Sequence, residues 1–438
     1  MKRVLVVSPH FPPINAPDMQ RVRMGLPYYR DAGWEPTILS VKASDIEGVL
    51  EPELMATIPP ATRIVETGAW PAKWTRRVGV GNIALRGFNH LRRAGNDLLA
   101  RERFDLVFFS NTQFGTFPLG NLWRRRFGVP FVLDMQDPWR TDYYERKGSR
   151  KPPGGWKYQF ARLQAAALEG PTVSRAAGVM SVSGSYIDDL RARYRNFTAP
   201  AEVIPFGASR ADLDVARAGP PSPAAPVHRG NEVHFTYTGA SGPVMPHALM
   251  VLFEALRRYR ERQPEQANRF RFHFFGTSYV PAGRGVASVI PIAEVCRVAD
   301  LVDEVPHRLG HLECIRLQAD ADILLLPGSS DLAYSPSKVY PYYLSAKPIL
   351  GLVFRDSVME QLLDELRCAY MVRFREREAK DEAYETLARF FEAVAAGTVK
   401  QLLPQRNEQY FSTHFLAESL THRQCALFDR ALEFEKTR

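Results

Sequence analysis

The sequence is poor in cysteine and contains no long hydrophobic run. Its 438 residues include four cysteines, and no two of them form a C-x-x-C pair. No cluster of histidines stands near them at metal-ligand spacing, so the sequence predicts neither a disulfide framework nor a metal site. No run of about 18 apolar residues suggests a membrane span. The basic start MKRVLVVSPHFPP has an apolar stretch too short for a signal peptide, and predicts a first β-strand in a cytoplasmic protein.

Acidic residues are too few to balance the basic ones. The 57 lysines and arginines exceed the 48 acidic residues, which gives a net charge of +9. Such a balance favours polyanionic partners: nucleic acid, an anionic membrane surface or phosphate-bearing substrates. Because the sequence has no zinc-finger spacing, aromatic RNA-binding motif or heptad zipper, we expect no nucleic-acid partner.

What the sequence does contain is a repeated alternation of apolar strands and amphipathic helices. In the first half, the strands are rich in Val, Ile, Leu and Phe without polar alternation, which is typical of parallel strands buried on both faces. Helical periods between them predict a doubly wound α/β sheet. The predicted strands are 2–8, 36–41, 62–66, 104–109, 130–134, 177–182 and 202–205, and the helices include 18–32, 115–127 and 156–175.

A Pro-, Ala- and Gly-rich stretch at 216–230 (ARAGPPSPAAPVHRG) predicts a linker, after which the alternation restarts. We therefore expect two Rossmann-like domains, 1–215 and 231–400, facing each other across a cleft. A helical segment at 401–438 is expected to cross back to the first domain. Ligands of such sheets bind at the carboxyl ends of the strands. The second half is predicted to hold strands 232–238, 270–275, 321–326 and 347–353, with helices 243–262, 310–319, from about 337, and 376–396.

In the first half, polar residues gather after two predicted strands. The loop SPHFPPINAPDMQR carries His10 and Asn15 and leads into a helix predicted to start near Asp18. The segment PFVLDMQDPW places Asp134, Gln136, Asp137 and Trp139 just past a buried strand. A carboxylate there could bind a sugar hydroxyl, orient an acceptor or stabilise developing positive charge. Equally, His10 could be a structural hydrogen-bonding residue, and Asp137 could cap a turn before Pro138.

In the second half, the strand ending at Thr238 is followed by Gly239-Ala240-Ser241-Gly242. Glycines let a backbone approach phosphate closely. The stretch SPSKVYPYY places Ser337 and Lys338 at a helix start, because Pro341 is tolerated only in the first turn. A lysine there suits a diphosphate, although a solvated helix start is the plainer alternative. Two further loops, with Thr277 and with His307 and Arg308, could contact a nucleobase or be ordinary loops.

A basic segment at 73–103 interleaves arginines with Trp74, Leu85, Phe88, Leu91 and Leu98. A basic amphipathic helix of this kind can rest on an anionic membrane. It can equally be a surface helix with an ordinary core face.

The ordered set of motifs resembles the retaining glycosyltransferases of the GT-B fold, group 1 or family-four-like. The resemblance spans nearly the whole chain and is carried by VLVVSPHFPP, FVLDMQDPW, YTGASG and PSKVYPYYLSAKPIL. It implies a hexosyltransferase that moves a sugar from a nucleotide-sugar donor to a glycan or lipid-linked acceptor with retention of anomeric configuration. No metal or other cofactor is implied. The expected setting is cell-surface polysaccharide biosynthesis, in the cytoplasm or peripherally at the inner face of the membrane.

The resemblance also implies roles for the candidate residues. Asp137, Lys338 and His10 are expected to be catalytic. The donor is expected to meet Gly239, Ser241, Gly242, Thr277, His307, Arg308, Ser337 and Lys338, and the acceptor Asn15, Arg21, Asp134, Gln136 and Trp139.

The sequence departs from the family pattern at three points. Asn15-Ala16-Pro17 replaces a Gly-Gly pair, and Pro243, Pro246 and His247 stand where a Lys or Arg often follows the donor-domain loop. The family's two glutamates seven residues apart fall near Ala333 and Pro341. The second glutamate normally holds the donor ribose. Two alternatives therefore stay open: a non-catalytic binding or assembly subunit of the same fold, and a nucleotide-sugar epimerase.

Overall fold

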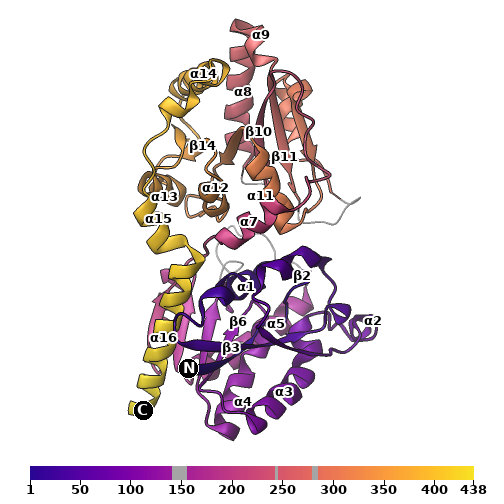
Figure 1. Ribbon diagram of the computed structural model, residues 1–438, viewed down its shortest axis with the longest axis vertical. Helices are drawn as coiled ribbons and strands as arrows, with labels where there is room; N and C mark the ends of the chain where they lie inside the picture. The colour runs from indigo at the N-terminus through magenta and orange to yellow at the C-terminus, as the bar shows by residue number, and fades with distance from the viewer. Residues whose placement is uncertain (141–154, 242–244, 279–284) are drawn as a thin grey trace. The chain divides into compact units, whose positions relative to one another are not determined.

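The computed structural model describes residues 1–140, 155–241, 245–278 and 285–438. The chain forms two compact units, each with its own parallel sheet and core (Figure 1). The first unit is Met1–Gly207 with His414–Arg438, and the second is Ala208–Thr413. The predicted α/β fold with two Rossmann-like domains is confirmed.

The first unit is built on a seven-stranded sheet in the order β5-β3-β1-β6-β7-β8-β9, in which every neighbouring pair is parallel. Buried apolar runs such as Val4–Val7 and Leu106–Phe109 explain why these segments form central strands. The strands are β1 (Lys2–Val7), β3 (Trp34–Val41), β5 (Arg63–Thr67), β6 (Leu106–Ser110), β7 (Phe131–Met135), β8 (Gly178–Ser181) and β9 (Ala201–Val203), and a separate antiparallel pair joins β2 (Ile14–Asn15) to β4 (Val49–Leu50).

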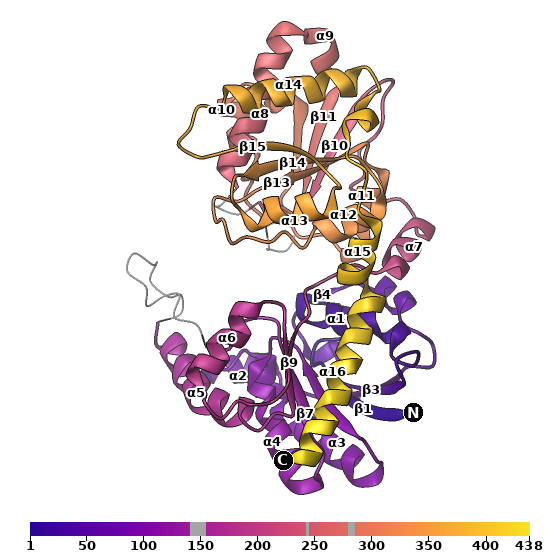
Figure 2. The ribbon, with the colours of Figure 1, turned by 90° about the vertical axis from the view of Figure 1, so that its left-hand side faces the viewer.

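Helices cover both faces of this sheet (Figure 2). One face packs under α3 (Ile83–Arg101), α4 (Pro118–Phe127), α5 (Trp156–Val173) and α6 (Gly184–Arg193). The other packs under α1 (Gln20–Gly25) and α16 (Ala417–Thr437), whose Phe428 ring meets those of Trp34 and Phe108. A short helix, α2 (Ala72–Thr75), precedes α3.

Two helix predictions for the first unit need correction. The helix expected over 18–32 is regular only in α1, with 3-10 turns at Pro17–Met19 and Leu26–Tyr28, so Asp18 lies in a turn and is not a helix cap. The segment 73–103 is broken by Gly79 in the left-handed conformation. In α3, Leu91 and Leu98 are buried in the core and Phe88 packs against it. The apolar face of α3 is therefore a core face.

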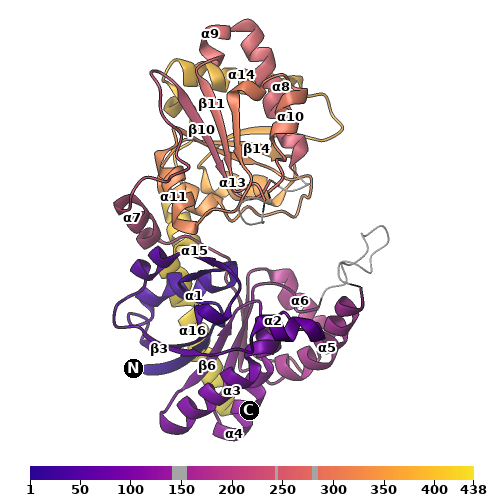
Figure 3. The same cartoon turned by 90° about the vertical axis from the view of Figure 1, so that its right-hand side faces the viewer.

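The second unit has a six-stranded parallel sheet in the order β12-β11-β10-β13-β14-β15. Helices α8 and α14 cover one face, and α11, α12 and α13 the other (Figures 2 and 3). The strands are β10 (Val233–Thr238), β11 (Phe270–Phe275), β12 (Val302–Val305), β13 (Ile323–Pro327), β14 (Ile349–Phe354) and β15 (Tyr370–Phe374). The helices are α7 (Arg210–Ala218), α8 (Pro246–Arg262), α9 (Pro264–Ala267), α10 (Ile290–Val295), α11 (His311–Asp320), α12 (Val339–Ser345), α13 (Val358–Leu366) and α14 (Asp381–Ala395), while α15 (Glu408–Phe415) runs across the boundary.

The stretch 216–230, expected to be a linker, lies inside the second unit, because the division falls at Gly207–Ala208. Its first three residues belong to α7, where the carbonyl of Ala216 accepts a hydrogen bond from Arg316 at 3.1 Å. Ser222 donates to Glu313 at 2.7 Å. The composition of this proline-rich segment predicts a linker. In the structure, hydrogen bonds to residues of α11 about a hundred positions away in the sequence hold the segment in place. The C-terminal residues 414–438 belong to the first unit.

Candidate functional site

In the loop after β1, a histidine is paired with a buried carboxylate. His10 Nδ1 lies 2.9 and 3.0 Å from the two carboxylate oxygens of Asp18. Thr112 donates to the same carboxylate from its backbone N–H (3.3 Å) and its hydroxyl (3.1 Å). Burial by itself raises the pKa of Asp18, but the hydrogen bond and charge of His10 and the Thr112 bonds outweigh it and leave the pKa lowered. Asp18 is therefore an ionised partner that orients the ring, with Nε2 on the side away from it.

Asp134 and Gln136, expected on the acceptor side, lie in a buried hydrogen-bond network. The carboxylate of Asp134 is completely buried and accepts from Ser110 Oγ at 2.7 Å and Gln136 Nε2 at 3.0 Å. Gln136 also donates to the backbone carbonyl of Asp18 at 3.1 Å. The bonds to Asp134 all reach Oδ2, while Oδ1 is buried without a hydrogen-bond partner among the described residues. The burial of both side chains gives Asp134 and Gln136 a positioning role behind the His10 loop.

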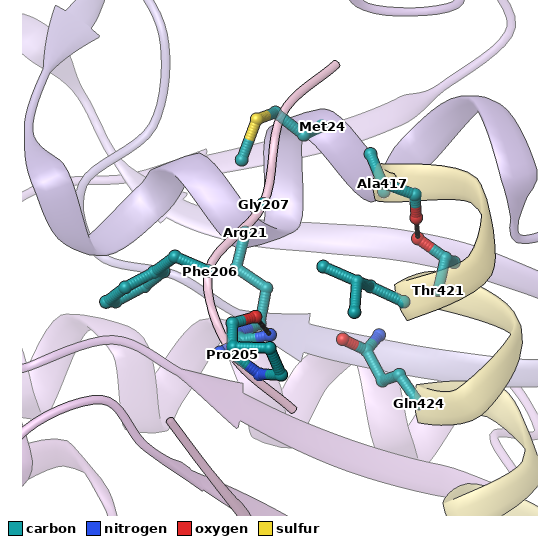
Figure 4. A pocket seen from close by; sticks show the side chains of 10 residues that line it. Arg21, Met24, Pro205, Phe206, Gly207, Ala417, Thr421 and Gln424 are labelled. Carbon is teal, nitrogen blue, oxygen red and sulfur yellow. Dashed lines mark hydrogen bonds between the residues drawn. The ribbon is translucent and has the colours of Figure 1, made fainter. Parts of the chain in front are cut away.

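Arg21 completes this network from α1. Its Nε lies 2.9 Å from Asp134 Oδ2, and both side chains are buried. Its guanidinium also donates to the carbonyls of Ile204 (2.7 Å) and Pro205 (3.2 Å). Figure 4 shows Arg21 beside the Pro205–Gly207 segment, with α16 on the opposite side of a small pocket. Arg21 thus joins α1 to β7 and to the segment after β9. These partners compensate its buried charge, which would be costly if left unpaired. The pocket is lined by Arg21, Met24, Gly25, Pro205, Phe206, Gly207, Ala417, Leu420, Thr421 and Gln424.

Among the first-unit candidates, Asp137 is solvent-exposed. Partial desolvation and the nearby charge of Asp18 nevertheless raise its pKa. Trp139 instead packs into the core, stacked on Phe114 with ring centroids 5.7 Å apart. Asn15 donates to Glu51 Oε2 at 2.8 Å and is buried. Asp137 and the partly exposed His10 are therefore the candidates in this unit that can meet a ligand directly.

In the second unit, the side chain of Lys338 lies where a side chain at Gly239 would be. Gly239 follows β10 with φ +135°, and a Cβ there would lie 1.8 Å from Lys338 Cε and 2.7 Å from its Nζ. Lys338 immediately precedes α12, and Pro341 is the third residue of that helix, which confirms the predicted helix start. The ammonium group lies 5.5 Å from the Tyr237 ring centroid. The absence of a side chain at Gly239 is what lets Lys338 lie against the loop.

The charge of Lys338 lies in a partly buried position. Burial lowers its pKa. Within the part of the chain that the structure describes, no carboxylate forms an ion pair with it. A desolvated cation without a counter-ion is costly unless an anion completes the site.

A carboxylate that sequence reasoning missed ties the neighbouring loops together. Glu304 of β12 accepts hydrogen bonds from the backbone N–H groups of Ser288 and Val289, each at 2.9 Å, and from the hydroxyl of Thr277. Ser288 is in turn hydrogen-bonded to Ser241. Thr277 and Ser241 are therefore linked through one carboxylate. A lone Glu inside the short strand VDEV gave no signal of this role.

The predicted donor residues lie at one edge of the second sheet. Gly239 and Ser241 follow β10, Thr277 follows β11, and His307 and Arg308 follow β12. These three strands are neighbours and parallel, so their carboxyl ends meet at one edge. Ser337 is exposed, next to Lys338. Gly242 lies outside the described residues.

The described residues contain no group of three or more His, Cys, Asp or Glu placed to hold a metal ion. In the same part of the chain, no helix is both long and apolar enough to span a bilayer.

Comparisons with known proteins agree with this architecture. A family model described as "Glycosyl transferase 4-like domain" matches residues 20–207. No curated protein sequence matches the chain significantly. Among solved structures, Anabaena HepE in complex with UDP is similar over 98% of this chain and 100% of its own, at 12% sequence identity and a TM-score of 0.55.

Two further structures are similar over their whole lengths. An α,α-trehalose-phosphate synthase (UDP-forming) from Burkholderia xenovorans aligns over 99% of this chain and 100% of its own, at 12% identity and a TM-score of 0.53. A structure from Listeria monocytogenes, provisionally named a UDP-N-acetylglucosamine 2-epimerase, aligns over 100% and 98%, at 12% identity and a TM-score of 0.51. With its two parallel sheets, the chain has the GT-B fold, and residues 20–207 of its first unit match a glycosyl transferase 4-like domain.

Proposed function

We propose that this protein is a glycosyltransferase that takes a sugar from a nucleoside-diphosphate sugar. The observation that carries the proposal is the Gly239–Lys338 pair at the carboxyl edge of the second sheet. The ammonium group is half-buried, pairs with no carboxylate of the described residues and lies against a glycine, which suits a diphosphate. The likeness to HepE in complex with UDP supports the same choice of ligand.

In this proposal the first unit binds the acceptor, a glycan or a lipid-linked sugar. His10, held by Asp18, would contact the acceptor hydroxyl through Nε2, and the exposed Asp137 would stabilise positive charge developing on the sugar ring. Asn15, Arg21, Asp134, Gln136 and Trp139 would support this loop from behind. The match of residues 20–207 to a glycosyl transferase 4-like domain supports this assignment of the first unit.

We propose retention of anomeric configuration without a metal or other cofactor, which rests on the resemblance of the motifs. The bond between the anomeric carbon and the diphosphate oxygen breaks, and that oxygen keeps the electron pair. Lys338 stabilises the leaving group, and a phosphate oxygen takes the acceptor proton as the new glycosidic bond forms. Ser241, Thr277, His307, Arg308 and Ser337 would hold the rest of the donor. Cell-surface polysaccharide assembly at the inner face of the membrane is the proposed setting.

The likeness to the Listeria structure makes an epimerase the second candidate. To separate the two, the purified chain is incubated with a panel of nucleotide sugars, with and without a lipid and glycan extract. A transferase releases nucleoside diphosphate only when an acceptor is present. Sugar interconversion with donor alone would assign the epimerase, and nucleotide binding without either reaction would assign a non-catalytic subunit.

A further inference from the structure

Two tryptophans stand exposed at one edge of the first unit. Trp70 is 54% exposed and Trp74 is 64% exposed, although large aromatic side chains are normally covered. They flank the start of α2, which lies at the right-hand edge of this unit in Figure 1. Pro71 between them is also exposed. The segment 70–77, called the tryptophan edge below, therefore presents apolar surface that this unit does not cover.

The tryptophan edge is fixed to the core of its unit. The backbone N–H of Trp70 donates to the carbonyl of Arg86 at 3.1 Å, and Arg86 Nε donates to the carbonyl of Trp70 at 2.8 Å. The Trp70 ring meets the His90 ring edge-on at 5.7 Å. Arg86 itself is buried in α3. Two hydrogen bonds to Arg86, one from its side chain and one to its carbonyl, thus fix the backbone of Trp70 where its ring is exposed.

The charges of the tryptophan edge have one sign. Lys73, Arg76 and Arg77 are exposed, and no acidic residue occurs between Trp70 and Arg77. Arg76 pairs with Glu47. Among the described residues, neither Lys73 nor Arg77 has a carboxylate within ion-pair distance. Two cations therefore remain available beside two exposed indoles.

We infer that the tryptophan edge docks on an anionic lipid membrane. Indole rings favour the headgroup region of a bilayer, where one end of the ring is apolar and the other wet. Lysine and arginine beside them are attracted to anionic lipids, each strengthening binding about fivefold. A neutral glycan would use the indoles but not the cations. The inference deepens the proposed function by naming its membrane contact, yet vesicle binding requires no nucleotide.

Vesicle co-sedimentation of the full chain tests this inference. The wild type should bind vesicles that contain phosphatidylglycerol and bind pure phosphatidylcholine vesicles at least about tenfold more weakly. The double variant Trp70→Ala with Trp74→Ala, and the double variant Lys73→Glu with Arg77→Glu, should each lose at least about tenfold in binding. The matched control is Phe160→Ala with Leu163→Ala on α5, an apolar pair of similar exposure (58% and 65%), which should bind as wild type does.

Three outcomes would overturn the inference: no vesicle binding by the wild type, equal binding to both vesicle types, or unchanged binding in both edge variants. Binding to a soluble glycan in place of vesicles would assign the edge to carbohydrate. The charge-reversal variant changes only exposed side chains, so it keeps the test valid if the tryptophan variant fails to fold. Thermal stabilisation by nucleotides, measured on the same samples, separates failure of this inference from failure of the proposed function.

Discussion

At the scale of single residues, the contact between Gly239 and Lys338 can be tested by substituting the glycine. Gly239→Ala would force a Cβ to within 1.8 Å of Lys338 Cε, and its φ of +135° suits only glycine. We expect a loss of about 1–3 kcal/mol in unfolding free energy from backbone strain, together with weakened nucleotide binding because the ammonium group must move. Thermal melting and calorimetry measure the two effects.

The matched control is Gly397→Ala, which shares a positive φ (+71°) but meets no atom within 4 Å. It should lose stability and keep its nucleotide affinity. Equal affinity in Gly239→Ala and wild type would remove the glycine from the donor site.

His10 and Asp18 make a second prediction at this scale. His10→Ala should lower the rate of sugar transfer by about 10²-fold, as for loss of a group that positions the acceptor hydroxyl, and leave nucleotide affinity unchanged, because the donor residues belong to the other unit. Asp18→Asn should have a smaller effect, since the amide can still hold the ring. Steady-state kinetics with the acceptor and calorimetry with the nucleotide check this. A purely structural role for His10 would lower the melting temperature without changing the rate at a temperature where the variant is folded.

At the scale of elements, β10 and β11 are joined by buried histidines at some distance from the donor loops. His234 Nδ1 and His273 Nε2 lie 2.9 Å apart, and the His228 ring is tilted against that of His234 with centroids 3.9 Å apart. Burial lowers the pKa of His273 to about 4; Asp303 opposes this shift, and the two neighbouring histidines add to it. The folded state therefore prefers the neutral ring, and the stability due to it is complete above the ordinary pKa of about 6.5.

This arrangement predicts a pH dependence of stability. As the pH falls from about 6.5 toward 4, the unfolded chain takes up a proton that His273 in the folded chain resists. The unfolding free energy should fall by at most about 3 kcal/mol, at about 1.4 kcal/mol per pKa unit. Denaturant titrations at a series of pH values measure it. In His273→Phe, the unfolding free energy should change less steeply with pH over this range. An unchanged slope would show that another group causes the loss of stability.

At the scale of the whole molecule, most of the buried strands and the start of α12 could be predicted from the sequence, and for the same reason. Buried parallel strands are continuous apolar runs, and Pro341 limits where a helix can begin, so both signals are local. The partly exposed β15 (Tyr370–Phe374) was not predicted. The burial of Asp134 and its pairing with Arg21 were not predicted, because they depend on a partner 113 positions away in the sequence. The packing of residues 216–230 and the burial of the apolar face of α3 likewise depend on residues distant in the sequence. Local pattern identifies an element; only the packed structure shows which face it buries.

The same distinction applies to the departures from the family pattern. Pro341 stands where relatives place a ribose-binding glutamate, and in the structure it lies in the first turn of α12 behind Lys338. The Gly239–Lys338 arrangement that we propose for phosphate binding is present without that contact. We therefore expect diphosphates alone to retain most of the binding free energy of full nucleotide sugars.

We propose that the second unit binds a nucleoside diphosphate through Lys338, and calorimetric titration of UDP into the full chain tests this proposal. The account predicts saturable binding to the wild type and a loss of about 1–3 kcal/mol in Lys338→Met, as for a charge-assisted contact. Lys347→Met, which removes a lysine just after α12, should bind as wild type does. Absence of binding by any nucleoside diphosphate at millimolar concentration, or equal affinity in Lys338→Met and wild type, would contradict the account.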